Sequence, residues 1–227
     1  MADDFWGTQL KPTYIENWPE GLYELSIPQK DIPMSAEEAV VLGAHIVELG
    51  ESFYRYLIPG NPYITLNSLK ERIEKALQYF SGGAFIRLGS RSPKDSWLGI
   101  QEGFRCTTAD RAVKLLTDVS ERVSDDLHAA IDHNYLPHIF VRQWRDIPRW
   151  GELRCFVKDR ELVGASQYFY QEYFPRLAER AAQVRKKLHE EIIPALIAVT
   201  HMDTVVFDIS LDCTRVFSDC ILMSYAH

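Results

Sequence analysis

The sequence predicts an α+β protein in which an antiparallel sheet carries packed helices. Strand-like runs at residues 152–157 and 161–167 are joined only by Asp159-Arg160, a link of the length found in tight antiparallel hairpins. Apolar residues recur at helical spacing over residues 177–199, which predicts a helix packed on that sheet. With 46% apolar residues in 227, the chain can bury one substantial core or two lobes that share a cleft.

The first third of the chain is predicted to be mainly helical. Residues 5–33 are typical of irregular chain with a short strand at residues 22–27. Residues 35–38 form a capping box that starts one helix, and residues 68–71 form a second box that starts another. The Gly82-Gly83 pair ends this second helix.

The pattern after these glycines changes to strand at residues 84–88, followed by a turn from Gly89 to Asp95. A long amphipathic helix over residues 112–131 ends before the helix breaker Pro137. These elements contribute both a strand and a covering helix to the predicted sheet.

The C-terminal part supplies the remaining strands. A run at residues 138–144 precedes the hairpin described above. A further hairpin-like pair, at residues 204–209 and 215–217 with Asp212 in its turn, ends the chain. We expect these runs to join one antiparallel sheet.

Composition narrows the classes of function. The net charge of -7 and a pI near 5.5 give no generalised basic surface, so we expect no nucleic-acid partner. The N-terminus lacks the pattern of a secretory signal, and no apolar run is long enough to span a bilayer. We therefore expect a cytoplasmic protein without a membrane association.

The four cysteines are scattered without a C-x-x-C pair, which predicts reduced thiols and does not support a zinc site.

Three arginines stand in otherwise apolar strand runs: Arg87, Arg142 and Arg154. An arginine on a sheet that also carries helices costs desolvation free energy unless it meets an anion or a solvent-filled groove. Converging arginines would suit a polyphosphate. Two alternatives remain open, namely that each arginine points to solvent and that Arg154 forms an ion pair with Glu152 on the same side of its strand.

One carboxylate interrupts an apolar strand run, since Asp208 lies within residues 205–209. A buried carboxylate needs a cation or hydrogen-bond donors, so a magnesium ligand fits, with a salt bridge or a helix cap as the alternative. The turn before Asp95 offers Ser92 and Lys94, which could cradle a phosphate, although any surface turn uses similar residues. The sequence has no P-loop, G-x-G-x-x-G, H-E-x-x-H or G-x-S-x-G motif.

The order of these motifs along the chain is more specific than any single motif. With its motifs in this order, the sequence resembles the cell division cycle protein 123 family. The matching blocks span residue 84 to about 216 and are Phe85-Ile86-Arg87-Leu88 with Ser92-Pro93-Lys94-Asp95, Val141-Arg142-Gln143-Trp144 with Glu152-Leu153-Arg154-Cys155-Phe156-Val157, Leu162-Val163-Gly164-Ala165-Ser166-Gln167, and Val206-Phe207-Asp208-Ile209.

The resemblance implies an ATP-grasp-like fold, with antiparallel sheets and packed helices forming a nucleotide cleft. It assigns residues 1–83 to a mainly helical part of the first lobe and residues 84–227 to the ATP-grasp-like core. ATP and Mg²⁺ are the implied cofactors. Arg87 falls where the family commonly has a phosphate-contacting lysine, in a block whose Ser-Pro-Lys-Asp turn is retained. The other implied contacts are Ser92, Lys94, Arg142 and Arg154 for phosphate, and Asp208 for magnesium.

The end of the chain departs from the family pattern, in which an apolar strand is followed by Asp-Phe-Asn-Pro. Here the chain reads Val216-Phe217-Ser218-Asp219-Cys220-Ile221. Asp219 can replace the first of these metal ligands, but no asparagine follows. Because magnesium usually keeps waters and can bind through one or two carboxylates, ATP binding survives this change.

Two functions follow from the resemblance. In the first, the protein is an ATP-dependent ligase that activates a carboxylate as an acyl-phosphate. In the second, it is a non-catalytic nucleotide-binding module that docks a protein partner, as eukaryotic members do when they bind the gamma subunit of translation initiation factor 2 during its assembly. The missing asparagine impairs catalysis more than docking. A phosphotransferase remains a third alternative.

Overall fold

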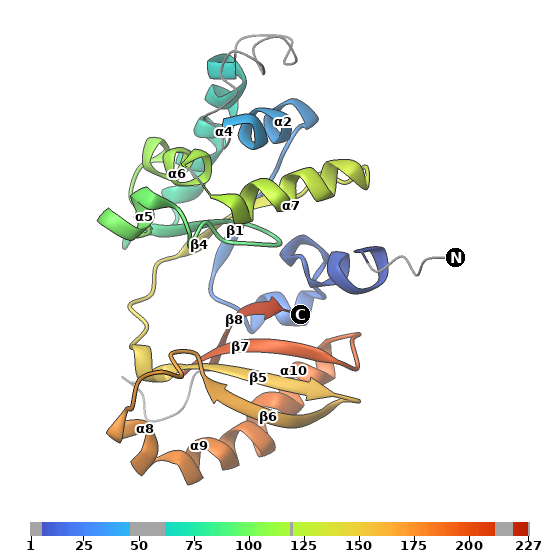
Figure 1. The fold of residues 1–227 in the computed structure, drawn as a ribbon, viewed down its shortest axis with the longest axis vertical. Helices are drawn as coiled ribbons and strands as arrows, with labels where there is room; N and C mark the ends of the chain where they lie inside the picture. Colours follow the sequence, from blue (N-terminus) through green and yellow to red (C-terminus); the bar gives the residue numbers. More distant parts are fainter. Residues whose placement is uncertain (1–5, 46–61, 119, 212–219, 227) are drawn as a thin grey trace. The chain divides into compact units, whose positions relative to one another are not determined.

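The computed structural model describes residues 6–45, 62–118, 120–211 and 220–226. These residues form two compact units, one within 29–144 and the other within 1–28 and 145–227. The predicted division at residue 84 coincides with neither limit of these units. Each unit is built on a four-stranded antiparallel sheet with helices, which confirms the predicted α+β class (Figure 1). The expectation of a single sheet is wrong, because the described strands form two sheets.

The unit of residues 29–144 has the strand order β1-β4-β2-β3, with all neighbours antiparallel. Its helices lie on one side of the sheet (Figure 1). The strands are β1 (Gln29–Pro33), β2 (Ala84–Leu88), β3 (Arg105–Cys106) and β4 (His138–Gln143), and the helices are α2 (Ala36–His45), α4 (Pro62–Leu77), α5 (Trp97–Glu102), α6 (Ala109–Thr117) and α7 (Glu121–Asp132).

Alternation along these strands separates a core face from an opposite face. Ile86 and Val141 are neighbours in the β2–β4 register and both belong to the buried cluster that also holds Leu69, Leu116 and Leu127 from the helices. Burial of each such aliphatic side chain stabilises the fold by about 1.5–3 kcal/mol. The core therefore lies between the sheet and the helical layer, and the odd-numbered residues of β2 face the other way.

The first predicted helix start is confirmed. The backbone N–H of Ser35 donates to Glu38 Oε2 at 2.9 Å, and the N–H of Glu38 donates to Ser35 Oγ at 3.2 Å. This reciprocal capping box satisfies two donors at the beginning of α2. The second predicted start is wrong, because α4 begins at Pro62 and Ser68 lies inside it. A proline at the first helical position can start a helix without a capping box.

The predicted long helix over residues 112–131 is two helices, α6 and α7. Thr108 caps α6 by accepting from the N–H of Arg111 at 3.2 Å. Ser120, with an extended backbone, caps α7 by accepting from the N–H of Val123 at 3.3 Å. The apolar spacing runs on across the break, but Ser120 bonds the backbone locally and so begins a new helix.

The other unit has the strand order β6-β5-β7-β8, also antiparallel throughout. In Figure 1, α9 and α10 lie along one side of this sheet. Its elements are η1 (Trp6–Leu10), η2 (Lys11–Thr13), η3 (Ile15–Asn17), α1 (Glu20–Glu24), η5 (Arg149–Gly151), β5 (Glu152–Lys158), β6 (Glu161–Gln167), α8 (Pro175–Glu179), α9 (Ala181–Lys187), η6 (Leu188–Ile192), α10 (Ile193–Val199), β7 (Val205–Leu211) and β8 (Cys220–Ala226).

The predicted β5–β6 hairpin is confirmed. Asp159 and Arg160 have φ angles of 52° and 65°. Positive φ at both central residues is the signature of a type I′ turn, whose twist matches that of the flanking strands.

The helix predicted over residues 177–199 is broken near Arg180 and contains the π-helical turn η6. The expectation that β4 joins this sheet is wrong, because β4 pairs with β1 and β2.

Two further sequence predictions concern the chain ends. The strand predicted at residues 22–27 is wrong, because Glu20–Glu24 is the short helix α1 and the strand is β1, at Gln29–Pro33. Pro19 precedes this helix with a φ of -57°, a geometry that leads readily into a helical turn. The strand predicted at residues 215–217 and the turn at Asp212 lie outside the described residues.

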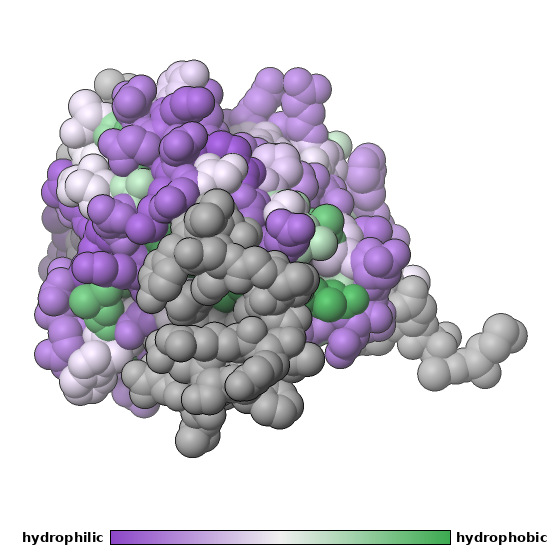
Figure 2. All heavy atoms as spheres, turned by 90° about the horizontal axis from the view of Figure 1, so that it is seen from above, coloured by the Kyte–Doolittle hydropathy of each residue, from purple (hydrophilic) through white to green (hydrophobic). Residues whose placement is uncertain are grey.

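No helix within the described ranges has the length and apolar character required to cross a bilayer. Seen from above Figure 1, the described surface is mainly hydrophilic, with small separate apolar spots (Figure 2). Cys106 and Cys155 are buried thiols that form no disulfide, as predicted, and burial raises the pKa of Cys106 to about 12. A thiol with so high a pKa is protonated at neutral pH and unreactive.

Candidate functional site

A bidentate ion pair joins the two central strands of the β6-β5-β7-β8 sheet. Arg154 on β5 is the register partner of Asp208 on β7. Its Nε donates to Asp208 Oδ1 at 2.7 Å and its Nη2 donates to Oδ2 at 2.8 Å. The structure thus contains the salt bridge that the sequence analysis gave as the alternative role of Asp208, and its partner is Arg154. The ion pair of Arg154 is with Asp208 and not with Glu152.

This pair lies on the sheet face opposite the α9–η6–α10 helix. Cys155 and Phe207, the next residues along the two strands, are fully buried and point the other way. The guanidinium of Arg154 also lies 5.2 Å from the centroid of the Tyr168 ring. The hydrogen bond to Asp208 raises the pKa of Arg154, so this side chain stays charged at any physiological pH.

The fit of this site to magnesium rests on one described carboxylate. The side chain of Asp208 is 7% exposed, and both its oxygens accept bonds from Arg154. No group of three or more potential ligand side chains occurs in the described part of the chain. Asp219, the second predicted ligand, lies outside the described residues. The donor set fits a magnesium ion that keeps waters and phosphate oxygens, provided that Arg154 releases one oxygen of Asp208.

The second group of candidate residues lies on the β1-β4-β2-β3 sheet. The register pairs Phe85 with Arg142 and Arg87 with Phe140. Arg87 and Arg142 therefore share one sheet face as diagonal neighbours, and it is the face opposite the core. They are 7% and 3% exposed, so the solvent-facing alternative is wrong for both. Two buried cations on one face are the kind of surface that binds an anion.

The turn after β2 is fixed to its own unit by side-chain bonds. Arg87 Nε donates to the carbonyl oxygen of Leu88 at 2.9 Å, and its Nη2 donates to the carbonyl oxygen of Ser90 at 3.1 Å. Arg91 Nε lies 3.0 Å from Asp126 Oδ1, and burial raises the pKa of that carboxyl. The turn is held at its start by an arginine and at its middle by an ion pair.

The far end of this turn is held by α7. Asp95 Oδ1 accepts from Ser120 Oγ at 2.6 Å, and Asp95 Oδ2 accepts from the N–H of Arg122 at 3.1 Å. An anion at a helix N-terminus is stabilised both by these bonds and by the helix dipole. Sequence reasoning missed this role of Asp95, and the Ser120 cap is the signal that would have revealed it.

The two predicted phosphate ligands of the turn differ in exposure. Ser92 is 6% exposed, whereas Lys94 is exposed, and the N–H of Lys94 donates to the carbonyl oxygen of Ser92 at 2.8 Å. Lys94 is therefore an accessible cation of the turn, as is Arg91, whose side chain pairs with Asp126. The structure brings together Arg87 with Arg142 in one unit and Arg154 with Asp208 in the other.

Comparison with curated proteins finds assembly proteins of translation initiation factor eIF2 among the relatives of this chain. An assembly protein of translation initiation factor eIF2 from Dictyostelium discoideum is 32% identical over 126 residues, which are 52% of this chain and 32% of the relative. The protein of the same name from Xenopus laevis is 26% identical over 126 residues, 52% of this chain and 37% of the relative. The chain thus matches about a third of the length of these relatives.

The fold comparison covers more of the chain. The structure of Cdc123 from Schizosaccharomyces pombe superposes with a TM-score of 0.76 and 23% sequence identity, over 96% of this chain and 84% of that one. At this identity the likeness establishes the fold alone. A model of the D123 family matches residues 56–223, most of the chain and all of the candidate residues. The resemblance to cell division cycle protein 123 is confirmed, and the chain belongs to the D123 family.

Proposed function

We propose that this chain binds ATP with Mg²⁺ and acts as a nucleotide-binding assembly factor for a protein complex. The observation that carries the nucleotide part is the Arg154–Asp208 pair. It combines a buried carboxylate with a partly exposed guanidinium on a sheet face that the α9–η6–α10 helix does not cover. Such a pair offers an oxygen ligand to magnesium and a fork of N–H donors to phosphate oxygens.

The second sheet supports the same function. Arg87 and Arg142 share one face, and Lys94 is an exposed cation in the fixed turn that follows Arg87. A polyphosphate carries several negative charges, which several fixed cations bind with little reorganisation. We propose that Arg87, Arg142 and Lys94, together with the backbone near Ser92, contact phosphate groups of the nucleotide. Magnesium bound by Asp208, with Asp219 as a second ligand, would neutralise phosphate charge.

The names of the relatives favour the assembly role. Proteins from several eukaryotes that match this chain carry the name of eIF2 assembly protein. We propose the gamma subunit of that factor as the partner and the cytoplasm as the place of assembly. The alternative, a ligase that forms an acyl-phosphate, is less favoured because the predicted metal site lacks the family's asparagine.

Calorimetric titration with ATP tests the nucleotide proposal. The wild-type chain should bind ATP more tightly with Mg²⁺ than without it, and Asp208→Asn should remove the magnesium dependence. Asp203→Asn is the matched control, because Asp203 is a 71% exposed aspartate that precedes β7 and pairs with Arg160 at the surface. If the wild-type chain does not bind ATP, or if both variants behave alike, the proposed site is wrong.

Binding of purified eIF2 gamma subunit tests the assembly proposal. We expect direct binding by the intact chain, and ATP with Mg²⁺ should change its affinity. Conversion of ATP to ADP or AMP in the presence of candidate acids and amines would instead favour the ligase. If there is neither gamma-subunit binding nor turnover, both proposals fail, even where ATP binds.

A further inference from the structure

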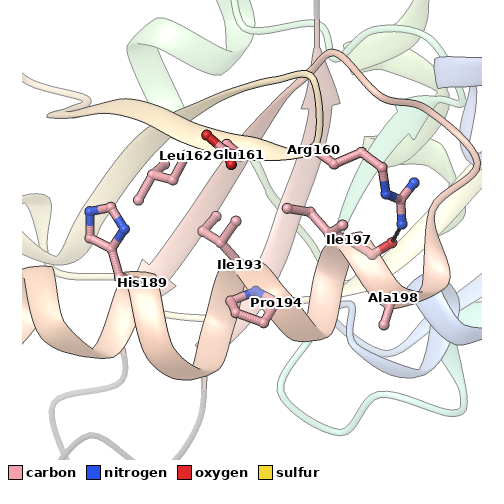
Figure 3. A pocket seen from close by; sticks show the side chains of 8 residues that line it. All are labelled: Arg160, Glu161, Leu162, His189, Ile193, Pro194, Ile197 and Ala198. Atoms are coloured by element: carbon pink, nitrogen blue, oxygen red, sulfur yellow. Dashed lines mark hydrogen bonds between the residues drawn. The ribbon is translucent and has the colours of Figure 1, made fainter.

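A pocket of about 560 Å³ lies beside β6, the outermost strand of the β6-β5-β7-β8 sheet, and none of the candidate nucleotide residues lines it. Figure 3 shows it between the start of β6, which contributes Glu161 and Leu162, and the helix that runs from His189 to Ala198. Its floor is aliphatic, formed by Leu162, Ile193 and Ile197. The charged and polar groups stand at the ends and the rim.

The pocket is held open by two local features. Arg160, at the end opposite His189, donates from Nη2 to the carbonyl oxygen of Ile197 at 2.7 Å and pairs with Asp203. This bond ties the hairpin turn to the last turn of α10, where the helix dipole favours a cation. The π-helical turn η6 (Leu188–Ile192) ends directly before Ile193. Turns of this kind recur at functional sites because they displace the side chains around them.

The strand beside the pocket is an edge strand. β6 is the outermost strand of its sheet and pairs only with β5 among the described strands. Natural sheets usually protect such an edge with lysine, proline or a covering element. The sequence of β6, Glu-Leu-Val-Gly-Ala-Ser-Gln, has neither residue, and Val163 is 63% exposed. The register with β5 shifts at Val163, which is a local bulge, and on either side of it no described strand pairs with the outer edge of β6.

The edge of β6 and the pocket together indicate which residues a strand added at this edge would carry. A strand added to β6 places the residue opposite Leu162 on the same sheet face as Leu162, over Ile193 and Ile197. The aliphatic floor selects a leucine, isoleucine or valine for that position. The neighbouring residue of the added strand lies opposite Glu161, an exposed carboxylate. Its register partner on β5 is Lys158, and among the described residues these two side chains form no ion pair. Opposite charges across a strand pair attract, so a lysine or arginine suits this second position.

We propose that β6 and this pocket bind an extended segment of a partner protein, with an aliphatic anchor residue in the pocket and a basic residue next to it opposite Glu161. The segment adds a strand to the β6 edge. Backbone hydrogen bonds along the edge contribute affinity, and the pocket and Glu161 contribute selectivity. The surface shares no residue with the nucleotide site proposed above, so either proposal can fail alone.

The test is selection of a random peptide library displayed on phage against the full chain, followed by affinity measurement with the selected synthetic peptides. We expect selected sequences to share an aliphatic residue next to a basic one.

Ala198→Arg, which places a large side chain at the exposed rim of the pocket, should weaken the binding of these peptides at least tenfold. Ala182→Arg is the matched control at an exposed alanine of α9, and it should leave affinity within about twofold. Val163→Lys, which protects the edge by a charge, should also weaken binding.

A charge exchange tests the second position. Glu161→Lys should weaken the basic peptides and bind better to a peptide in which the basic residue is replaced by glutamate. Thermal unfolding of each variant checks that the fold is intact. The proposal is overturned if no sequence pattern is selected, or if the selected peptides bind Ala198→Arg as well as wild type. Self-association of the wild-type chain that Val163→Lys abolishes would overturn it too, because the edge would then bind a second copy.

Discussion

The two sheets carry their candidate cations on the face opposite the core helices, but they stabilise those cations differently. Arg87 bonds to the backbone carbonyls of Leu88 and Ser90, which are neutral acceptors, so these bonds leave its positive charge in place. Arg154 bonds to both oxygens of Asp208, whose negative charge offsets its own. Bonds to neutral carbonyl groups do not by themselves offset the charge of an arginine. An arginine bonded to a carboxylate attracts phosphate fully only when a metal ion competes for that carboxylate.

Breaking the Arg154–Asp208 pair should give the largest effect. Asp208→Ala should lower the free energy of unfolding by about 1–3 kcal/mol, because it leaves a partly buried guanidinium without its acceptor. Solvent screening keeps the loss below that of a fully buried ion pair, since the side chain of Arg154 is 37% exposed. Urea unfolding of both single variants and of the double Asp208→Ala, Arg154→Ala variant measures the coupling. Strictly additive single effects would contradict the pair.

Replacing Arg87 should affect the nucleotide more than the fold. Arg87→Met keeps the length of the side chain but removes its charge, and should weaken ATP about tenfold, equivalent to about 1.4 kcal/mol. Arg87→Lys restores the charge at the position where the family commonly has a lysine, and should stay within about threefold of wild type. Calorimetry checks both. Equal losses in the two variants would show that the fork geometry, and not the charge, is what matters.

Loosening the turn after β2 should have a smaller effect. Asp95→Asn keeps the size of the side chain but weakens its bonds to Ser120 and to the N-terminus of α7, and should cost about 1 kcal/mol of stability. Amide hydrogen exchange should become faster at Lys94 in the variant. Unchanged exchange in this turn would mean that Arg91 and Arg87 alone fix it.

The smallest effect concerns Asp126, whose pKa is raised by burial. A carboxyl with a raised folded-state pKa binds its proton more tightly in the folded protein, so the folded state gains stability as the pH falls through that pKa towards the ordinary value of about 3.9. The free energy of unfolding of wild type relative to Asp126→Asn should therefore rise over this window. Urea unfolding between pH 7 and pH 4 measures it, and a relative fall in wild-type stability would refute the shift.

The elements predicted well are those whose signals are local. Residues 84–88 and 161–167 are strands with the expected limits, and the capping box of Ser35 forms as expected. The misplaced elements are those where a local cap competes with a continuing apolar pattern, as at Ser120, or where a proline starts a helix, as at Pro62. Periodicity reports which face is buried and does not report where a helix is interrupted.

The candidate site was predictable as a set of residue types but not as a set of contacts. Arg154 and Asp208 were both chosen from the sequence, yet the contact between them joins positions 54 apart. Only the register of β5 with β7 brings them together, and no local pattern specifies that register. The same holds for Arg87 and Arg142, which share a face through the β2–β4 register.

The Asp159-Arg160 turn has a consequence for the order in which the protein folds. β5 and β6 are joined by only two residues, of which Asp159 tolerates left-handed backbone well, so this hairpin can close within about 1–10 μs. β7 must close a much longer loop before it pairs with β5, and distant pairing is slower. Arg154 is thus in place on a formed hairpin before Asp208 arrives. A nascent chain in which β7 has not yet docked would leave the inner edge of β5 unpaired and Arg154 without the carboxylate of Asp208.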